Sequence, residues 1–569
     1  MKKLCSVFLS LLMILALSCG TAFAAETQEE QDPGLLADVL GAMDSAYVGA
    51  NIKLYVKADK NAGLQTKTKV RFNQTDFNGA VYFPGNVDPT GMKLSWNDPD
   101  LTLSQNGKTY KSGKAPIAPV GESVTYLAND GAKTALLTIK TVRGSSSVGA
   151  LFLTVDEKKG TIKAMNNDPD HENSCYGKAM FDGKTKYMSI KGRGNSTWVF
   201  PKKPYNITFY DDATYDSKDG VKMIKGVKSK KWSIVANHLD NSLLRNKIAL
   251  DLADDLGIGM KTRFMDVWLN GAYLGNYLVT PKNDYATPDD GYGLENDNYV
   301  EPGASFQLPG MTELGDIPGV SILGSGYFNR ICLKNVGDNA AAKGVDLKYV
   351  KKHFLKAWAA VEDYDSEAYQ QYFDMDSWAK MYLMYEVTKT YDAYAGSLLM
   401  HRDGLSKNDK LIAGPAWDYD ISLGRTLHKF FIGIPEPMQL NAEGWYVDSI
   451  CEMITNEPVS LLQELGKHPS FRAHVKKVYR DYEWAFQNMA KNVSRQQSLL
   501  RDSALMNNVR WGTNNLCADY LVAPNTMSVL GTGQYQLNYK VTTTWDDYVY
   551  NLKEFCNKRV LWLSDHTGA

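Results

Sequence analysis

The sequence predicts an α+β protein that begins with a small all-β sandwich. Short alternating apolar and polar runs fill the chain from about residue 51 to residue 148, and helical periodicity dominates after about residue 346. The chain has 569 residues, of which 44% are apolar, so it can bury sizeable cores and is neither disordered nor a coiled coil. Its 63 basic and 64 acidic residues nearly cancel, so we expect no nucleic-acid partner.

Residues 1–24 have the pattern of a secretory signal peptide. Two lysines precede an apolar run of about 11 residues, and Ala22-Phe23-Ala24 offers small residues for cleavage after Ala24. The apolar run is shorter than the roughly 20 residues of a spanning helix, so we expect no transmembrane segment. The sequence therefore predicts a secreted or cell-surface protein. A lipoprotein anchored through Cys19 is the alternative.

The next two segments precede the main domain. Residues 25–49 predict an acidic leader with one short amphipathic helix near Leu35 to Tyr47. Residues 50–148 contain seven or so short strands at a spacing of about 8–12 residues, which is the size and rhythm of an immunoglobulin-like β-sandwich. Gly144-Ser145-Ser146-Ser147 is the predicted linker to the main domain.

Residues 149–569 predict a sheet-rich part, about 149–285, followed by a helix-rich part, about 346–569. A cleft between two such parts is a common place for a ligand. The expected strands are Leu151 to Val155, Tyr187 to Lys191, Tyr205 to Tyr210, Lys231 to Ala236, Phe264 to Leu269 and Ala272 to Val279. The expected helices are Ser242 to Leu256, Leu347 to Val361, Ser366 to Phe373, Asp376 to Thr388, Val459 to Leu465, Pro469 to Lys491 and Thr544 to Ser564.

The first segment that could bind a ligand or take part in catalysis contains an arginine between two glycines. In Gly192-Arg193-Gly194-Asn195 the backbone can approach an anion while the guanidinium supplies charge, and Lys202 and Lys203 follow about ten residues later. This is the composition of a phosphate site. The alternatives are an ordinary turn and, for the two lysines, a solvated strand edge.

A pair of carboxylates marks the second segment. Asp418 and Asp420 are two residues apart, so on a strand they would share one face and repel unless a cation lay between them. Hard oxygen ligands of this kind select Mg²⁺, Mn²⁺ or Ca²⁺. Surface carboxylates near a turn are the alternative. The apolar neighbours Trp417 and Tyr419 favour the metal site.

Five blocks then occur in one order between Leu151 and Leu563. They read IKGRGNSTWVFPKKPYNI, KKWSIVANHLDNSLLRNKIALDLADDLG, NGAYLGNY, DMDSWAKMYLMYEVTKTYDAYAGS and AGPAWDYDISLG. Together they resemble the CotH-like spore-coat kinases, an atypical branch of the protein-kinase-like fold. The resemblance implies a two-lobed domain over residues 149–569, with the immunoglobulin-like segment as an accessory.

The resemblance also implies a function, which is the transfer of the γ-phosphoryl group of ATP to a Ser or Thr hydroxyl of a protein partner. A divalent cation, Mg²⁺ or Mn²⁺, would assist, and the implied partners include cell-surface or coat proteins. The implied roles are catalysis for Asp392; nucleotide contacts for Arg193, Asn195, Lys203 and Trp417; and metal ligation for Asp420, Asp418 and Ser397.

Two positions depart from the family pattern. Ser397 stands where many members carry an asparagine as second metal ligand, and Pro281 stands where a glutamate usually ends a strand near the hinge. A hydroxyl is a weaker magnesium ligand than an amide carbonyl, and proline removes a backbone donor. The alternative is therefore a catalytically weak or inactive kinase-like protein that serves as a surface or coat component or binds a glycan or host protein.

Overall fold

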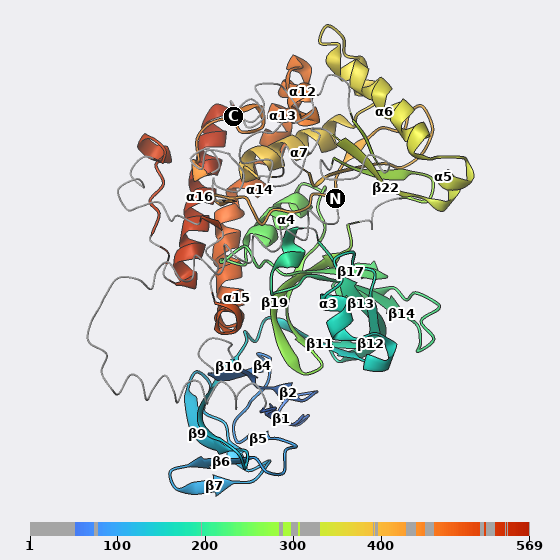
Figure 1. The fold of residues 1–569 in the computed structure, drawn as a ribbon. Coiled ribbons are helices and arrows are strands. Elements are labelled where there is room, and N and C mark those ends of the chain that lie inside the picture. Colours follow the sequence, from blue (N-terminus) through green and yellow to red (C-terminus); the bar gives the residue numbers. More distant parts are fainter. Residues whose placement is uncertain are drawn as a thin grey trace, which may run out of the picture.

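The structure, a computed structural model, is an α+β protein whose strands precede most of its helices (Figure 1). The predicted signal peptide and leader, residues 1–49, lie outside the described residues. Within the part of the chain that is described, no helix is long and apolar enough to cross a membrane. The described residues are 52–72, 78–194, 196–283, 288–296, 305–307, 330–390, 392, 396–427, 440–449, 460–512, 517–518, 530–540, 542 and 544–567.

Residues 52–143 form an all-β unit at the bottom of Figure 1. Its strands are β1 (Tyr55–Val56), β2 (Thr68–Lys69), β3 (Arg71–Phe72), β4 (Gly79–Phe83), β5 (Lys93–Ser95), β6 (Thr102–Gln105), β7 (Lys108–Tyr110), β8 (Ala115–Pro116), β9 (Ser123–Asn129) and β10 (Thr134–Arg143). They make a four-stranded sheet, β2-β1-β5-β8, and a six-stranded sheet, β3-β4-β10-β9-β6-β7. Along β9 buried and exposed side chains alternate strictly, so one face covers the core and the other meets water. We call residues 52–143 the N-terminal unit.

The next part is a closed seven-stranded barrel. Its strands are β11 (Gly149–Val155), β12 (Ser174–Phe181), β13 (Lys184–Gly192), β14 (Tyr205–Tyr210), β17 (Lys231–Val235), β18 (Arg263–Leu269) and β19 (Ala272–Pro281). The order β11-β12-β13-β14-β17-β19-β18 closes because β11 also pairs in parallel with β18. A short hairpin, β15 (Val221–Ile224) and β16 (Val227–Ser229), and a short helix, α3 (Ile162–Asn166), accompany the barrel.

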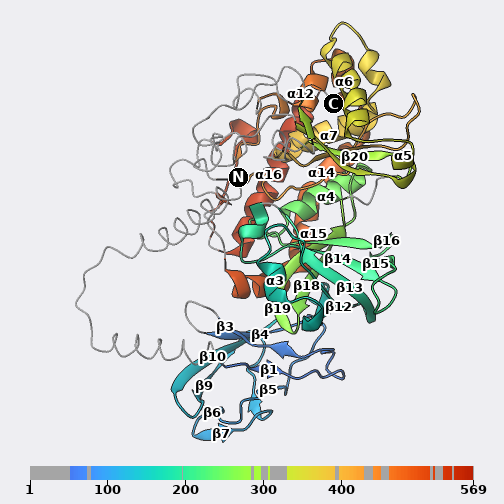
Figure 2. The same ribbon diagram turned by 45° about the vertical axis from the view of Figure 1, so that its right-hand side comes forward.

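Helices and a five-stranded sheet form the rest of the molecule. The helices are α4 (Arg245–Asp255), α5 (Asp338–Ala342), α6 (Leu347–Glu362), α7 (Met375–Thr388), α12 (Leu461–Gly466), α13 (Pro469–Asp481), α14 (Glu483–Gln487), α15 (Met489–Trp511) and α16 (Trp545–His566). The sheet has the order β21 (Ser305–Gln307), β22 (Arg330–Val336), β20 (Tyr292–Asn296), β23 (Leu398–Arg402) and β24 (Ile412–Ala413). In Figures 1 and 2, α4 lies between the barrel and the other helices.

Three helical predictions need correction, and one helix was missed. The predicted helix Ser366 to Phe373 is only a short 3-10 helix, Ala368–Gln371. Helix α4 starts at Arg245 instead of Ser242 because Leu243 has a positive φ of 63° and cannot belong to a right-handed helix. The predicted helix Pro469 to Lys491 ends at Asp481, where Tyr482 leaves helical geometry with φ −116° and ψ 13°. Helix α15 was not predicted, because several of its buried positions are polar, among them Asn492, Gln496, Ser503 and Asn507.

The segment predicted as a linker is fixed to α15. The backbone NH of Ser145 donates to the Ser503 hydroxyl at 2.8 Å, and the backbone NH of Ser503 donates to the Ser145 hydroxyl at 3.1 Å. Ser147 Oγ donates to the carbonyl of Leu499 at 2.9 Å. Ser145 is only 5% exposed, so this segment holds the N-terminal unit against the helix and does not act as a free tether.

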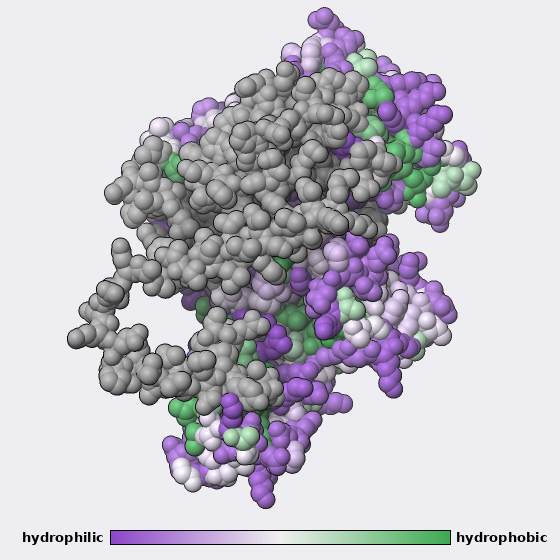
Figure 3. Space-filling view, in the orientation of Figure 1, coloured by the Kyte–Doolittle hydropathy of each residue, from purple (hydrophilic) through white to green (hydrophobic). Residues whose placement is uncertain are grey.

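Aromatic stacking completes the junction between the N-terminal unit and the barrel. The rings of Tyr82 and Tyr273 stack with centroids 4.7 Å apart, and the backbone NH of Lys69 donates to the carbonyl of Gly271 at 2.8 Å. The described surface of the N-terminal unit is mainly hydrophilic in Figure 3. Its buried apolar side chains pack in a core of their own and, around Tyr82, at this junction.

Candidate functional site

Four of the predicted site residues lie together in the structure. Arg193, Asp392, Asp418 and Asp420 come from three distant segments, yet their charges act on one another. Burial and next the charges of Asp418 and Asp420 raise the pKa of Asp392, and the charge of Arg193 opposes the rise that burial causes in the pKa of Asp418. We call these four residues the acidic cluster.

Arg193 follows directly after β13 and is positioned by its glycine neighbours. A Cβ atom on Gly192 would lie 2.5 Å from the ring of Trp198, so only glycine fits beneath that tryptophan. Gly194 has a φ of 91°, which favours glycine as well. The chain can therefore turn sharply at Arg193, and the guanidinium lies over the ring of Trp417 at 5.2 Å.

The loop that carries Asp418 and Asp420 is anchored by backbone hydrogen bonds. The NH of Ala416 donates to the carbonyl of Ile258 at 2.8 Å, and the NH of Leu423 donates to the carbonyl of Thr388 at 2.7 Å. The prediction that the two aspartates lie on a strand is wrong, because Asp418 has a left-handed φ of 63°. The irregular backbone nevertheless keeps both carboxylates at the cluster.

Helix α4 holds the same loop from the other side. Asn246 Oδ1 accepts the NH of Tyr419 at 2.7 Å, and Arg245 Nε donates to the carbonyl of Ser422 at 3.0 Å. Both side chains are buried in the first turn of the helix. The block that contains α4 thus serves to position the aspartate pair.

Asp392 lies just beyond the end of α7. The helix stops where Lys389 adopts a left-handed φ of 48°. The hydroxyl of Ser397, which also has a positive φ of 60°, donates a hydrogen bond to the Asp392 carboxylate and so lowers its pKa. Ser397 therefore contacts the predicted catalytic carboxylate.

The acidic cluster holds excess negative charge in a poorly hydrated place. Burial raises the pKa of Asp392 well above its ordinary value, and the charges of Asp418 and Asp420 raise it further. Burial also raises the pKa of Asp418 and of Asp420. Arg193 opposes the shift in Asp418, and Arg425 and then Arg193 oppose it in Asp420. Repulsion between buried carboxylates is what a bound cation relieves.

The cluster fits a divalent cation by donor type and charge. Its carboxylate oxygens are the ligands that Mg²⁺ and Mn²⁺ prefer. Among the residues that the structure describes, however, no three or more His, Cys, Asp or Glu side chains are already spaced as a closed metal site. A cation there would need ligands beyond the protein, as Mg²⁺ usually has.

Lys203 contacts an aromatic side chain and not a carboxylate. Its ammonium donates to the carbonyl of Trp198 and lies over that ring at 4.7 Å, and burial alone lowers its pKa. Lys202 is 1% exposed, so its interpretation as a solvated strand edge is wrong. Burial lowers the pKa of Lys202 to about 7, with Asp266 and Asp240 opposing the shift.

The other predicted residues have different surroundings. Trp417 is 6% exposed and packs against Met260 and Leu399, with Arg193 over its ring. Pro281 ends β19 and pairs with Trp232 of the barrel. Asn195 lies outside the described residues.

Sequence reasoning missed two carboxylates near the cluster. Glu295, on β20, is 7% exposed, forms an ion pair with Lys334, and raises the pKa of Asp392. Asp240 is 1% exposed and pairs with Arg245 at 2.7 Å. Asp240 accepts the NH groups of Ser242 and Arg245, and a turn of this kind is typical of aspartate before a helix, so Asp240 could have been found. Glu295 carries no such signal, because its position depends on strand pairing.

The chain thus has an α+β fold in which the charge of Arg193 acts on the aspartates of the acidic cluster. The model of the family described as CotH kinase protein matches residues 190–563, and the chain belongs to this family. A similar curated protein is the inner spore coat protein H of Bacillus subtilis (strain 168). It is 24% identical over 258 residues, which cover 42% of this chain and 60% of that protein.

Proposed function

We propose that the protein is an exported, atypical protein kinase that transfers the γ-phosphoryl group of ATP to a Ser or Thr hydroxyl of a coat or surface protein. The observation that carries the proposal is the convergence of Arg193, Asp392, Asp418 and Asp420 from three separate segments. Family membership and the similarity to a spore coat protein support it.

The proposal treats the barrel and the helix-rich part as two kinase-like lobes, and the N-terminal unit as an immunoglobulin-like accessory. Helix α4 lies between the two parts and contacts the aspartate loop through Asn246 and Arg245 (Figure 1). A substrate at the acidic cluster would therefore lie close to elements of both parts.

Each residue of the cluster has a role in this proposal. Asp420 and Asp418 would hold Mg²⁺ or Mn²⁺, which would supply positive charge against the phosphates of ATP. Arg193 would contact a phosphate oxygen, and this contact is the stronger because the guanidinium is partly desolvated. Asp392 would accept and orient the hydroxyl of the acceptor. Neutralising Asp418 and Asp420 would lower its pKa, since both charges raise it.

The direct test is transfer of labelled phosphate. The chain without residues 1–24 is incubated with labelled ATP, Mn²⁺ or Mg²⁺ and a Ser-rich acceptor protein. We expect incorporation that Asp392→Asn and Asp420→Ala abolish and that the exposed-site control Asp365→Asn retains. A folded wild-type chain that transfers no phosphate with either metal would refute the proposed kinase activity.

A second candidate is binding without catalysis. The observation that favours it is the position of Trp417, whose ring is covered by Arg193 and is therefore closed to a nucleotide base unless the arginine moves. A coat, glycan or host-protein ligand would then stabilise the chain, whereas ATP with Mn²⁺ would leave the melting temperature unchanged. Thermal melts with each ligand separate the two candidates.

A further inference from the structure

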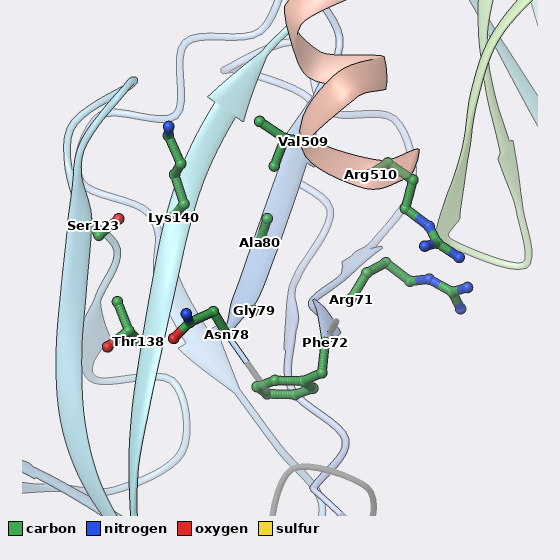
Figure 4. A pocket seen from close by; sticks show the side chains of 10 residues that line it. All are labelled: Arg71, Phe72, Asn78, Gly79, Ala80, Ser123, Thr138, Lys140, Val509 and Arg510. Carbon is green, nitrogen blue, oxygen red and sulfur yellow. The ribbon is translucent and has the colours of Figure 1, made fainter. Parts of the chain in front are cut away.

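A pocket lies where the N-terminal unit meets the last turn of α15 (Figure 4). Its volume is about 220 Å³, several times the roughly 30 Å³ that one water molecule occupies in the liquid. Strands β3, β4 and β10 line it together with the end of α15. Three of its ten lining residues, Arg71, Lys140 and Arg510, are basic and none is acidic.

Two of these basic side chains come from different parts of the fold and face one another. In Figure 4 the guanidinium groups of Arg71, from β3, and Arg510, from α15, lie side by side. Burial and, next, the positive charge of Arg71 lower the pKa of Arg510 to about 10. Burial also lowers the pKa of Arg71. The two cations therefore repel across the junction.

The described residues supply no carboxylate to balance this charge. Neither arginine forms an ion pair within the described part of the chain, and Arg510 instead lies over the ring of Trp511 at 4.0 Å. The Nε–H of Arg510 is buried and has no hydrogen-bond acceptor there. A buried donor without an acceptor is costly, and so is a pair of like charges, unless a ligand satisfies both.

The wall beside the arginines is closely built. A Cβ atom on Gly79 would lie 2.8 Å from Val70 Cγ1 and 2.9 Å from Phe72 Cε1. Only glycine therefore lets β4 pass beneath the Phe72 ring, which lies next to Arg71 in the pocket. Packing fixes the backbone that presents Arg71.

We propose that this pocket binds a phosphate group between the guanidinium groups of Arg71 and Arg510, and that the phosphate links the N-terminal unit to α15. A phosphate monoester carries up to two negative charges and three acceptor oxygens, which match two guanidinium groups better than the single charge of a carboxylate. Lys140 also lines the pocket, with its ammonium directed away from the two guanidinium groups (Figure 4). The site is independent of the proposed kinase activity, since none of its lining residues belongs to the acidic cluster.

The phosphate could be free or part of a larger molecule. The pocket has room for more than the ion itself, so a phosphorylated side chain or another monoester also fits the chemistry. Inorganic phosphate, O-phosphoserine and dimethyl phosphate distinguish these sources, because only the first two can carry two charges. Acetate tests for a carboxylate.

The experiment is a thermal melt of the chain without residues 1–24 in a phosphate-free buffer, with each probe titrated against sodium chloride of equal ionic strength. We expect inorganic phosphate and O-phosphoserine to raise Tm saturably by about 1–3 °C, and dimethyl phosphate and acetate to have little effect. The increase should disappear in Arg71→Gln and in Arg510→Gln. It should persist in Arg193→Gln and in the exposed controls Lys57→Gln and Lys491→Gln.

The two arginine variants also have an expected Tm in the absence of any ligand. Removing one of two repelling cations should leave Tm unchanged or raise it, so a folded Arg71→Gln chain that has lost the phosphate response supports the proposal. An equal response in the wild type and both arginine variants, an equal response to chloride, or a response to acetate as large as that to phosphate would each overturn it.

Discussion

Asn246 and Tyr419 are joined by a hydrogen bond of 2.7 Å between the amide oxygen of the first and the backbone NH of the second. Tyr419 separates the two aspartates of the acidic cluster, and Asn246 is itself held by a 3.0 Å bond from its amide nitrogen to Asn237 Oδ1. The first turn of α4 therefore fixes the loop on which the proposed metal ligands stand.

Replacing Asn246 by alanine should loosen this loop. The buried NH of Tyr419 would lose its acceptor, which costs about 1–3 kcal/mol in the free energy of unfolding. We also expect a weaker rise in Tm on addition of Mn²⁺, since the two carboxylates would no longer be held in place. Denaturant melts with and without Mn²⁺ measure both effects. The exposed Asn61→Ala serves as control, and the prediction is wrong if both variants behave alike.

The buried ion pair between Asp240 and Arg245 should be costly to break from one side. Both side chains are at most 2% exposed, and Arg245 Nη1 lies 2.7 Å from Asp240 Oδ1. Arg245→Met removes the ion-pair partner of the buried carboxylate and leaves the charge of Arg425 and the hydrogen bonds from Ser242 to balance it, so we expect a loss of about 3–5 kcal/mol. Adding Asp240→Asn should recover part of that loss. A double-mutant cycle from urea melts measures the coupling energy between the two side chains. Strictly additive effects of the two single substitutions would contradict this prediction.

Asp420 should destabilise the metal-free protein at neutral pH. Its pKa is raised in the folded state, so the unfolded chain ionises first as the pH rises. Stability is therefore lost between the ordinary carboxyl pKa and the raised value, by about 1.4 kcal/mol for each unit of difference. We expect Asp420→Asn to melt a few degrees higher than the wild type at pH 8 and to converge with it near pH 4.

The same variant should lose its response to metal. Mn²⁺ or Mg²⁺ should raise the Tm of the wild type at pH 8 and less so at pH 5, because protonated carboxylates bind cations poorly. Asp365→Asn should follow the wild type throughout. A wild-type Tm that does not depend on Mn²⁺ at any pH would remove the metal role of Asp420.

Ser503 should couple the linker segment to a buried carboxylate. Its hydroxyl donates to Asp266 Oδ2 at 2.6 Å and accepts the NH of Ser145. Burial raises the pKa of Asp266 to about 6, and the bond from Ser503 opposes the shift. Ser503→Ala should therefore cost about 1–3 kcal/mol, and stability should fall over a wider pH range above 4 because the pKa of Asp266 rises further.

The control for Ser503 is Ser498→Ala, an exposed position on the same helix whose hydroxyl bonds only to its own helix at 3.2 Å. Chemical melts at pH 5 and pH 8 measure the difference. Equal losses in the two variants would show that Ser503 has no special role.

The α+β class and much of the barrel could be predicted from the sequence, because local periodicity determines where strands occur. The predicted strand Tyr205 to Tyr210 is confirmed as β14, and Phe264 to Leu269 lies within β18. Closure of the barrel could not be predicted, since the parallel pairing of β11 with β18 joins strands about 110 residues apart in sequence. Strand β12 was missed as well.

The candidate site was only partly predictable for the same reason. The glycines around Arg193 and the paired aspartates are local signals, whereas the choice between Lys202 and Lys203 depends on which side of the chain faces the core. Lys202 donates to the carbonyl of Asn276 at 2.6 Å, a contact that no spacing reveals. Glu295 reaches the neighbourhood of Asp392 through the pairing of β20 with β23.

The closed order of the barrel strands limits how copies of this protein can associate. Because β11 pairs with both β12 and β18, the barrel offers no free strand edge for another polypeptide to extend. The sheets of the N-terminal unit, in contrast, end in β2, β8, β3 and β7, each paired on one side only among the described strands. Assembly by strand addition would therefore use an open sheet, such as those of the N-terminal unit or the five-stranded sheet β21-β22-β20-β23-β24, and leave the barrel unchanged.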